Sequence, residues 1–245
     1  MAKTKLTKDV VNAYSLIAHR GLHGNGVSEN SLKAFSLAIE NGLAFELDCH
    51  LSKDGRLIVC HDSDLGRVTG SRGFIPDLTL QEIKEKYRLH DGQEVPSLEE
   101  VLSLNAERSP MVIELKVDKK NDAKIASAVL KALEGIKDKD KVSLISFYPK
   151  ALRKCAKSRF STGLLVYSKH PILKRLSFLF DYLDVEELLL DDPYYAKYRK
   201  KGGFINTWTI ESKSQLKRIQ GEVDMVTFQH LPIEEVRLAL RRKEG

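Results

Sequence analysis

The protein has 245 residues, of which 42% are hydrophobic and 30% charged, and its 40 basic and 34 acidic residues give a formal charge of +6. This length is typical of one (β/α)₈ barrel, and the composition is that of a chain able to bury a core. The basic residues are spread along helix-like segments, and no stretch of 18 uncharged apolar residues occurs, which argues against a dedicated nucleic-acid surface and against a membrane-spanning helix.

The N-terminal residues 1–9 contain no apolar signal core, which predicts a cytoplasmic protein. Cys49, Cys60 and Cys155 form no CxxC pair and no zinc-ligand spacing. We therefore expect all three to be reduced and structural.

The first apolar run covers residues 15–18 and ends in His19-Arg20-Gly21. A strand that delivers a histidine and an arginine into a glycine-containing loop is suited to an anion, although a lone histidine at a strand end is more often structural. Asn30 and Ser31 can cap the helix that follows, whose apolar residues share one face until Asn41-Gly42 ends it.

The segment 44–51 alternates strictly between apolar residues and the polar residues Glu46, Asp48 and His50, so it predicts a strand with two carboxylates on one face. Like charges at this spacing repel each other unless a positive charge lies between them. Carboxylate oxygens suit Mg²⁺, Ca²⁺ or Mn²⁺, so the strand indicates a metal site. A solvated acidic strand edge is the alternative interpretation.

Asp54-Gly55 predicts a tight turn, after which residues 56–60 return as a second strand that ends at His61. A two-residue turn would place Asp48 opposite His61 and Cys49 opposite Cys60. A three-residue turn closed by a glycine bulge would shift the register by one residue and break this pairing.

The pattern changes after His61-Asp62. Capping boxes at residues 79–82 and 97–100 predict two short helices, with polar loops between them. We interpret residues 62–96 as an insertion over the mouth of a barrel and residues 97–106 as the helix that returns to it.

Strands and helices alternate regularly in the rest of the chain. The further strands are expected at 111–116, 142–147, 162–167, 187–191, 204–210 and 224–228, and the helices at 121–134, 149–158, 171–183, 193–201, 212–220 and 232–242. With the strands at 15–19 and 44–51 the total is eight. The sequence therefore predicts a single TIM (β/α)₈ barrel domain over residues 1–245, with its site at the carboxyl ends of the strands.

Seven polar residues meet at that predicted mouth, because Glu114 and Lys116 lie on one face of the strand at 111–116. Three acids could bind a hard cation, two histidines could transfer protons, and two cations could neutralise a phosphate. Together they predict a phosphoryl-transfer site. The metal ligands are Glu46, Asp48 and Glu114, and the catalytic residues are His19, His61, Arg20 and Lys116.

Ordered motifs over residues 17–210 resemble those of the glycerophosphodiester phosphodiesterases. They are His19-Arg20-Gly21, Glu29-Asn30-Ser31 (with Ser28 where the family usually has proline), Glu46-Leu47-Asp48, Lys53-Asp54-Gly55, His61-Asp62 with Leu65, Arg67 and Thr69, Ile113-Glu114-Leu115-Lys116, and Trp208-Thr209. The resemblance implies a TIM barrel with a small insertion after the His-Asp motif.

The same resemblance implies hydrolysis of glycerophosphodiesters to glycerol 3-phosphate and an alcohol, with one Mg²⁺ or Ca²⁺ on the three acids. It implies His19 as base and His61 as acid, with Arg20 and Lys116 binding the substrate. Glu29 and Asn30 are expected to support these groups from behind. Trp208 would line the glycerol pocket, or it would simply fill the barrel.

Two departures from the family pattern concern the rim of the site. Glu211 stands where the family commonly has asparagine, and Phe228-Gln229-His230 follows Thr227 where the family usually has aspartate. We expect both to affect selection of the alcohol and neither to touch the metal or the histidines.

Three other functions remain as alternatives. A related barrel phosphodiesterase of the phospholipase C or D type would release a cyclic phosphate after internal attack by a substrate hydroxyl. A phosphodiester-binding protein would need the cations but no matched pair of histidines. A nucleic-acid-binding role would rest on the basic charge alone. The alcohol, the metal and the oligomeric state stay open at this point.

Overall fold

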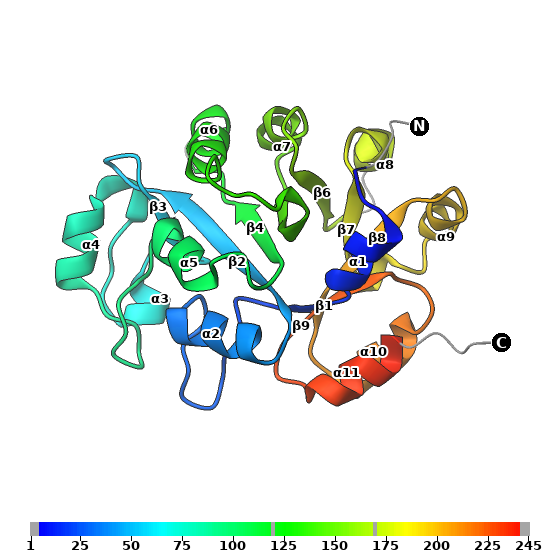
Figure 1. Ribbon diagram of the computed structural model, residues 1–245, viewed down its shortest axis with the longest axis horizontal. Helices are drawn as coiled ribbons and strands as arrows, with labels where there is room; N and C mark the ends of the chain where they lie inside the picture. The colour runs from blue at the N-terminus through cyan, green and yellow to red at the C-terminus, as the bar shows by residue number, and fades with distance from the viewer. Residues whose placement is uncertain (1–4, 119–120, 169–170, 241–245) are drawn as a thin grey trace.

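In the computed structural model, which describes residues 5–118, 121–168 and 171–240, eight parallel strands form a closed barrel (Figure 1). The barrel strands are β1 (Leu16–Ala18), β2 (Ala44–Leu51), β4 (Met111–Leu115), β5 (Val142–Ser146), β6 (Ser161–Val166), β7 (Tyr182–Glu186), β8 (Phe204–Ile210) and β9 (Met225–Phe228). Closure comes from β1, which pairs with β9 on one side and with β2 on the other.

Helices follow the strands and cover the outside of the barrel (Figure 1). They are α2 (Leu32–Glu40), α5 (Leu98–Asn105), α6 (Asp122–Ala132), α7 (Pro149–Cys155), α8 (Pro171–Leu176), α9 (Pro193–Lys200), α10 (Lys213–Ile219) and α11 (Ile233–Leu240). Alternate residues of each strand, such as Phe45 and Leu47 of β2, face these helices in the main apolar core. The predicted TIM-barrel fold class is thus confirmed. The helix expected at 232–242 is described as far as Leu240, and its last two residues lie outside the described part.

The other strand residues point into the barrel. Many of them are apolar and form a second core inside the barrel, which Leu6, Val11 and Tyr14 from the segment around α1 (Lys8–Ala13) join. Their partners in this second core are Ile17, Ala44, Val112, Ile145, Leu165, Tyr182 and Met225. The sequence analysis did not predict α1, because one short helical stretch has too few residues for a clear periodic pattern. Ile145 and Leu165 of this core also line the cavity that the polar interior residues surround.

Residues after β2 form a separate lobe at one end of the molecule, drawn in cyan in Figure 1. It contains β3 (Leu57–Val59), α3 (Gly66–Thr69), the 3₁₀ turn η1 (Ile75–Asp77) and α4 (Leu80–Lys86). The lobe buries its own apolar cluster, which includes Ile58, Val68 and Ile83. Both capping boxes form, at the amino ends of α4 and α5. A second small core explains why this segment interrupts the regular alternation.

The β2–β3 hairpin has the shifted register. Cys49 pairs with Val59 and His50 with Ile58, and Gly55 adopts φ +79° in a three-residue turn. The pairings of Asp48 with His61 and of Cys49 with Cys60 are therefore wrong by one residue. The left-handed glycine supplies the extra residue that a three-residue turn requires.

The seventh barrel strand also differs from the prediction. β7 spans Tyr182–Glu186, whereas residues 187–189 form the 3₁₀ turn η4 (Glu187–Leu189) and α8 stops at Leu176 before the 3₁₀ turn η3 (Ser177–Leu179). The expected strand at 187–191 is wrong, and the helix expected at 171–183 begins at Pro171 but ends at Leu176. The apolar run at 188–190 resembles a buried strand more closely than β7 does, because β7 contains acidic residues that weaken its apolar pattern. In the structure, however, Leu188 of this run is 63% exposed.

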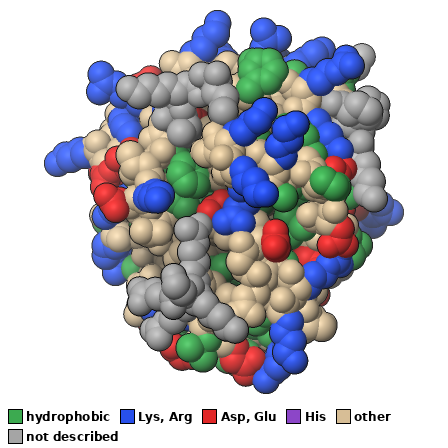
Figure 2. Space-filling view, turned by 90° about the vertical axis from the view of Figure 1, so that its right-hand side faces the viewer, with side chains coloured by type: hydrophobic (Ala, Val, Ile, Leu, Met, Phe, Trp, Pro, Cys, Tyr) green, Lys and Arg blue, Asp and Glu red, His purple; other side chains and the backbone are tan. Residues whose placement is uncertain are grey.

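The surface charge is dispersed. Figure 2 shows the face that lies at the right of Figure 1, where basic side chains spread across the whole surface with acidic ones between them. α8 and α9 each end in basic residues, among them Arg175 and Lys197. In the described ranges, no helix combines the length and the apolar character that crossing a bilayer would need.

We predict that Gly163→Ala destabilises the barrel. A Cβ at Gly163 would lie 2.3 Å from Cζ of the buried Tyr182, whose hydroxyl bonds Ser143 Oγ at 2.9 Å. Overpacking of this kind costs about 1–3 kcal/mol in the free energy of unfolding, which urea denaturation measures. Gly135→Ala is the matched control, because a Cβ there meets nothing within 4 Å. Equal stability of the two variants would contradict the prediction.

Candidate active site

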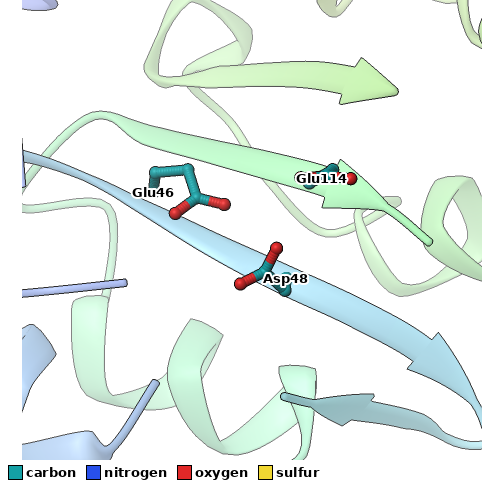
Figure 3. Close-up of side chains that lie close together, drawn as sticks. All are labelled: Glu46, Asp48 and Glu114. Carbon is teal, nitrogen blue, oxygen red and sulfur yellow. The ribbon is translucent and has the colours of Figure 1, made fainter. Parts of the chain in front are cut away.

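Three carboxylates meet inside the barrel near the carboxyl ends of the strands. Glu46 and Asp48 come from β2 and Glu114 from β4, and the parallel register places Asp48 beside Glu114 (Figure 3). Each offers an oxygen within 4.8 Å of the others, and their exposed fractions are 4%, 1% and 7%. A set made only of buried carboxylate oxygens fits a hard divalent cation such as Mg²⁺ or Ca²⁺.

Two cationic side chains contact this carboxylate cluster. Lys116 Nζ lies 2.9 Å from both Asp48 Oδ1 and Glu114 Oε1. Arg20 Nε lies 3.5 Å from Asp48 Oδ2, and the Arg20 backbone N–H donates to Glu46 Oε2 at 2.9 Å. These groups partly compensate the repulsion among the carboxylates.

The three carboxyl groups differ in acidity. Burial would raise the pKa of Asp48, but Lys116, His61 and Arg20 lower it below its ordinary value. Burial, followed by the neighbouring Asp48 and Glu114, raises the pKa of Glu46 well above the usual range. Burial likewise raises the pKa of Glu114 to about 7. Protons therefore remain on the two glutamates at mildly acidic pH, and a bound cation would displace them.

His19 follows β1 and lies beside the cluster. Its Nε2 is 4.0 Å from Glu46 Oε2, and its Nδ1 is 2.6 Å from the side-chain oxygen of Gln229. Burial, with a smaller effect of Arg20, lowers the pKa of His19 to about 4. The imidazole is therefore neutral at pH 7.

His61 lies just beyond the β2–β3 hairpin and lines the same cavity as His19 and the cluster. Its Nδ1 is 2.7 Å from Asp62 Oδ1. Burial lowers the pKa of His61, while Asp48 and Asp62 oppose this shift. The two histidines thus have different Nδ1 partners, an amide for His19 and a carboxylate for His61.

A chain of ion pairs joins the ends of β1 and β3. Arg20 Nη1 binds Glu29 Oε1 at 2.8 Å, and Arg67 Nη2 binds the same oxygen at 2.7 Å. Arg67 also binds Asp62, which contacts His61. Glu29 therefore lies behind Arg20.

Asn30 occupies the place behind Asp48. Its Nδ2 donates to Asp48 Oδ2 at 2.8 Å, while the cap of α2 is made by Ser31 alone. His50 lies beside the cluster on β2, where its ring nitrogens contact Asp118 Oδ2 at 2.6 Å and the His61 carbonyl at 3.0 Å. Both side chains fix groups next to the cluster.

A cavity of about 120 Å³ connects these groups. Its walls include His19, Arg20, Glu46, His61, Glu114, Lys116, Phe147, Asp184, Trp208 and Thr227. Trp208 is half-buried, packs edge-on against Phe147 at 5.6 Å and donates from Nε1 to the Asp184 carbonyl at 3.1 Å. The structure thus brings the seven predicted polar residues and Trp208 around one space, because Asp48 contacts Lys116 and Arg20 at its edge.

Sequence reasoning missed two residues of this region. Asp184 of β7 is 2% exposed and accepts from Asn206 Nδ2 at 2.6 Å, and burial raises its pKa to about 7. It was missed because β7 was placed five residues too late. Gln229 was expected not to touch the histidines, and this is wrong, because its side chain contacts His19. The family pattern was the available signal, since both Gln229 and its partner Glu211 depart from it.

Comparison with known proteins gives a consistent result. The model of the glycerophosphoryl diester phosphodiesterase family matches residues 19–230. A glycerophosphodiester phosphodiesterase of Caldanaerobacter subterraneus is 30% identical over 83% of this chain and 88% of its own.

Solved structures agree with this. The enzyme of Thermotoga maritima is 30% identical, with a TM-score of 0.75 over 91% of this chain and 96% of its own. A phosphodiesterase of Oleispira antarctica, solved with the product sn-glycerol-3-phosphate, is 25% identical, with a TM-score of 0.81 over 93% of this chain and 98% of its own.

We predict that Glu114 makes the metal-free protein less stable as pH rises. A carboxyl group whose pKa is higher in the folded than in the unfolded state adds to the stability of the fold when it is protonated. This contribution is complete below the pKa of the unfolded chain, about 4.5, and is lost as the pH rises through the pKa of the folded protein, about 7. In chelator, the free energy of unfolding of the wild type should fall between these pH values relative to that of Glu114→Gln. The depressed pKa of His19 has the opposite effect in this range, but it is common to both proteins.

Urea titrations at several pH values measure this difference. The exposed Glu134 supplies the control, because Glu134→Gln should follow the wild type at every pH. Parallel curves for wild type and Glu114→Gln would show that Glu114 titrates normally.

Proposed function

Because this chain belongs to the glycerophosphodiester phosphodiesterase family, we propose that it hydrolyses glycerophosphodiesters to glycerol 3-phosphate and an alcohol with the help of a divalent cation. The observation that carries the proposal is the arrangement around one cavity of three buried carboxylates, two cations and two histidines with unlike partners. The glycerol 3-phosphate bound in the Oleispira antarctica phosphodiesterase supports this product.

Glu46, Asp48 and Glu114 would bind the cation, which is Mg²⁺ or Ca²⁺ in this proposal. The bound cation supplies the positive charge that polarises a phosphate oxygen. Asn30 keeps one Asp48 oxygen oriented by its hydrogen bond, and Lys116 holds the other. The cluster can therefore bind without large rearrangement of Asp48.

Arg20 and Lys116 would stabilise the negative charge that develops on the phosphoryl group. Both line the cavity beside Glu46 and Glu114. Glu29 fixes the Arg20 guanidinium from behind, so its charge is already oriented before the substrate arrives. Trp208 and the interior residues of β7 and β9 would enclose the glycerol part.

His19 would be the general base and His61 the general acid. Gln229 Oε1 lies 2.6 Å from His19 Nδ1, and Nε2 is the ring nitrogen that would take a proton from the attacking water. The carboxylate of Asp62 on His61 Nδ1 opposes the lowering of the His61 pKa by burial, and so supports a charged imidazole that can give a proton to the leaving alkoxide. Unlike partners thus support opposite roles for the two histidines.

We predict that Asp48→Asn lowers kcat by at least about 100-fold, the size of a lost electrostatic stabiliser. It should also abolish the increase in melting temperature that Mg²⁺ or Ca²⁺ gives the wild type, because the cluster loses its most acidic ligand. Release of glycerol 3-phosphate from glycerophosphocholine, with and without chelator, measures activity. Asp9→Asn changes an exposed aspartate of α1 and should behave as wild type. Full activity of the wild type in chelator would refute the metal requirement.

We predict that His61→Ala loses most activity on glycerophosphocholine but keeps a large fraction on a nitrophenyl phosphodiester. Choline leaves as a poor alkoxide that needs a proton, whereas nitrophenolate leaves unprotonated. His19→Ala should be impaired on both substrates, because the water still needs activation. Steady-state kcat values on the two substrates measure the effect.

Two outcomes would change the mechanism. Equal losses on both substrates for His61→Ala would remove His61 as the acid, and the reverse pattern would exchange the two roles. A cyclic phosphate as the final product would replace hydrolysis by internal attack of a substrate hydroxyl.

A further inference from the structure

Two rim residues, Glu211 and Gln229, form a hydrogen-bonded pair behind His19. Glu211 is the first residue after β8, Gln229 is the first residue after β9, and Gln229 N bonds the Ile210 carbonyl at 3.1 Å. His19 follows β1, and its own N–H bonds the Phe228 carbonyl at 3.0 Å. Three adjacent strand ends therefore place these side chains in a row, Glu211 to Gln229 to His19.

The chemistry of the pair decides which way the Gln229 amide points. Its Nε2 donates to Glu211 Oε1, and a carboxylate can only accept. The amide oxygen must then face the histidines, where it lies 2.6 Å from His19 Nδ1 and 3.2 Å from His23 Nε2. A reversed amide would bring its nitrogen to His19 and leave the Glu211 carboxylate facing the amide oxygen, two acceptors with no hydrogen between them.

The oriented amide also decides the tautomer of His19. A carbonyl oxygen has no hydrogen to give, so the contact at Nδ1 requires a hydrogen on that ring nitrogen. In a neutral imidazole the lone pair then lies on Nε2, the nitrogen 4.0 Å from Glu46 Oε2. The opposite tautomer would turn an N–H toward the cluster, and it could not accept a proton there.

We propose that Gln229, oriented by Glu211, is a positioning residue that holds His19 in the tautomer with its lone pair directed at the carboxylate cluster. The inference rests on the proposed function insofar as His19 is the base. An amide oxygen carries no full negative charge, so it raises the pKa of the ring less than a carboxylate would, and burial keeps the His19 pKa below its ordinary value. A carboxylate such as the Asp62 that contacts His61 would favour the charged ring instead.

The tautomer itself can be observed without turnover. Long-range ¹H–¹⁵N correlation spectra at pH 7 report which nitrogen of each histidine ring carries hydrogen, and His19→Ala identifies the His19 signals. We expect hydrogen on Nδ1 in the wild type and a mixture of tautomers in Gln229→Leu. A wild-type ring with its hydrogen on Nε2 would overturn the proposal. Nδ1–H in a wild type inactive on glycerophosphodiesters would leave the positioning intact and refute the proposed function alone.

Kinetics of variants at positions 229 and 211, including one that exchanges the two side chains, distinguish a positioning role of Gln229 from simple packing. Gln229→Leu should lower kcat by about 10–100-fold on both glycerophosphocholine and the nitrophenyl diester, with little change in KM. Gln229→Glu keeps an acceptor for His19 but opposes the carboxylate of Glu211. The double variant Gln229→Glu with Glu211→Gln restores an amide–carboxylate pair and an acceptor for His19 Nδ1–H, so it should recover most of the lost kcat at alkaline pH, where the ring is neutral despite the added carboxylate.

Gln220→Leu is the matched control, because Gln220 is exposed at the end of α10 and should leave activity unchanged. Circular dichroism checks that each variant is folded. Wild-type kcat in Gln229→Leu, or a double variant no better than Gln229→Glu alone, would overturn the proposal. Should Gln229→Leu fail to fold, the wild-type spectrum and the swapped pair still decide it.

Discussion

The mutual repulsion of three buried carboxylates is the constraint on which the rest of the site depends. Glu46, Asp48 and Glu114 lie together because two strands in register turn alternate residues inward. Burial strengthens every charge interaction there, since little water screens them. Of the three carboxylates, Asp48 receives the most compensation from Lys116 and Arg20, and its pKa is lowered. The uncompensated repulsion acts on the two glutamates, whose pKa values are raised. The cluster is thus poised to exchange protons for a cation.

The barrel and its lobe both contribute charged groups around the carboxylate cluster. His19 and Arg20 come from the end of β1, while His61 comes from the start of the lobe beyond β3. Glu29 and Arg67 connect the two sides through short ion pairs. Most of these groups are only partly exposed, so the connection is screened less than an ordinary surface salt bridge. The lobe is therefore tied to the site electrostatically as well as by the chain.

Local patterns in the sequence predicted most of the helices and strands. They failed where contacts between distant residues determine the local structure. The apolar spacing and Ser31 cap predicted α2, and strict alternation predicted the inward carboxylates of β2. β7 was misplaced because Asp184 faces a polar interior, where the usual apolar signal of a barrel strand is lost. The hairpin register depended on one left-handed glycine, Gly55. The contact of Gln229 with His19 spans 210 positions, and no local pattern encodes it.

The α1 segment, which joins the second core inside the barrel, has a consequence for the order of folding. Tyr14 and Val11 of the α1 segment are buried against residues as distant as Met225. A ribosome adds about 5–20 residues per second, so roughly 200 residues and about 10–40 s separate the synthesis of the two sides of this contact. Ile17, Ala44 and Val112 of the same cluster are made early, whereas Met225 is made last. The full set of partners of the α1 segment is therefore available only after β9 has been made, which is also when β1 and β9 can pair and close the ring.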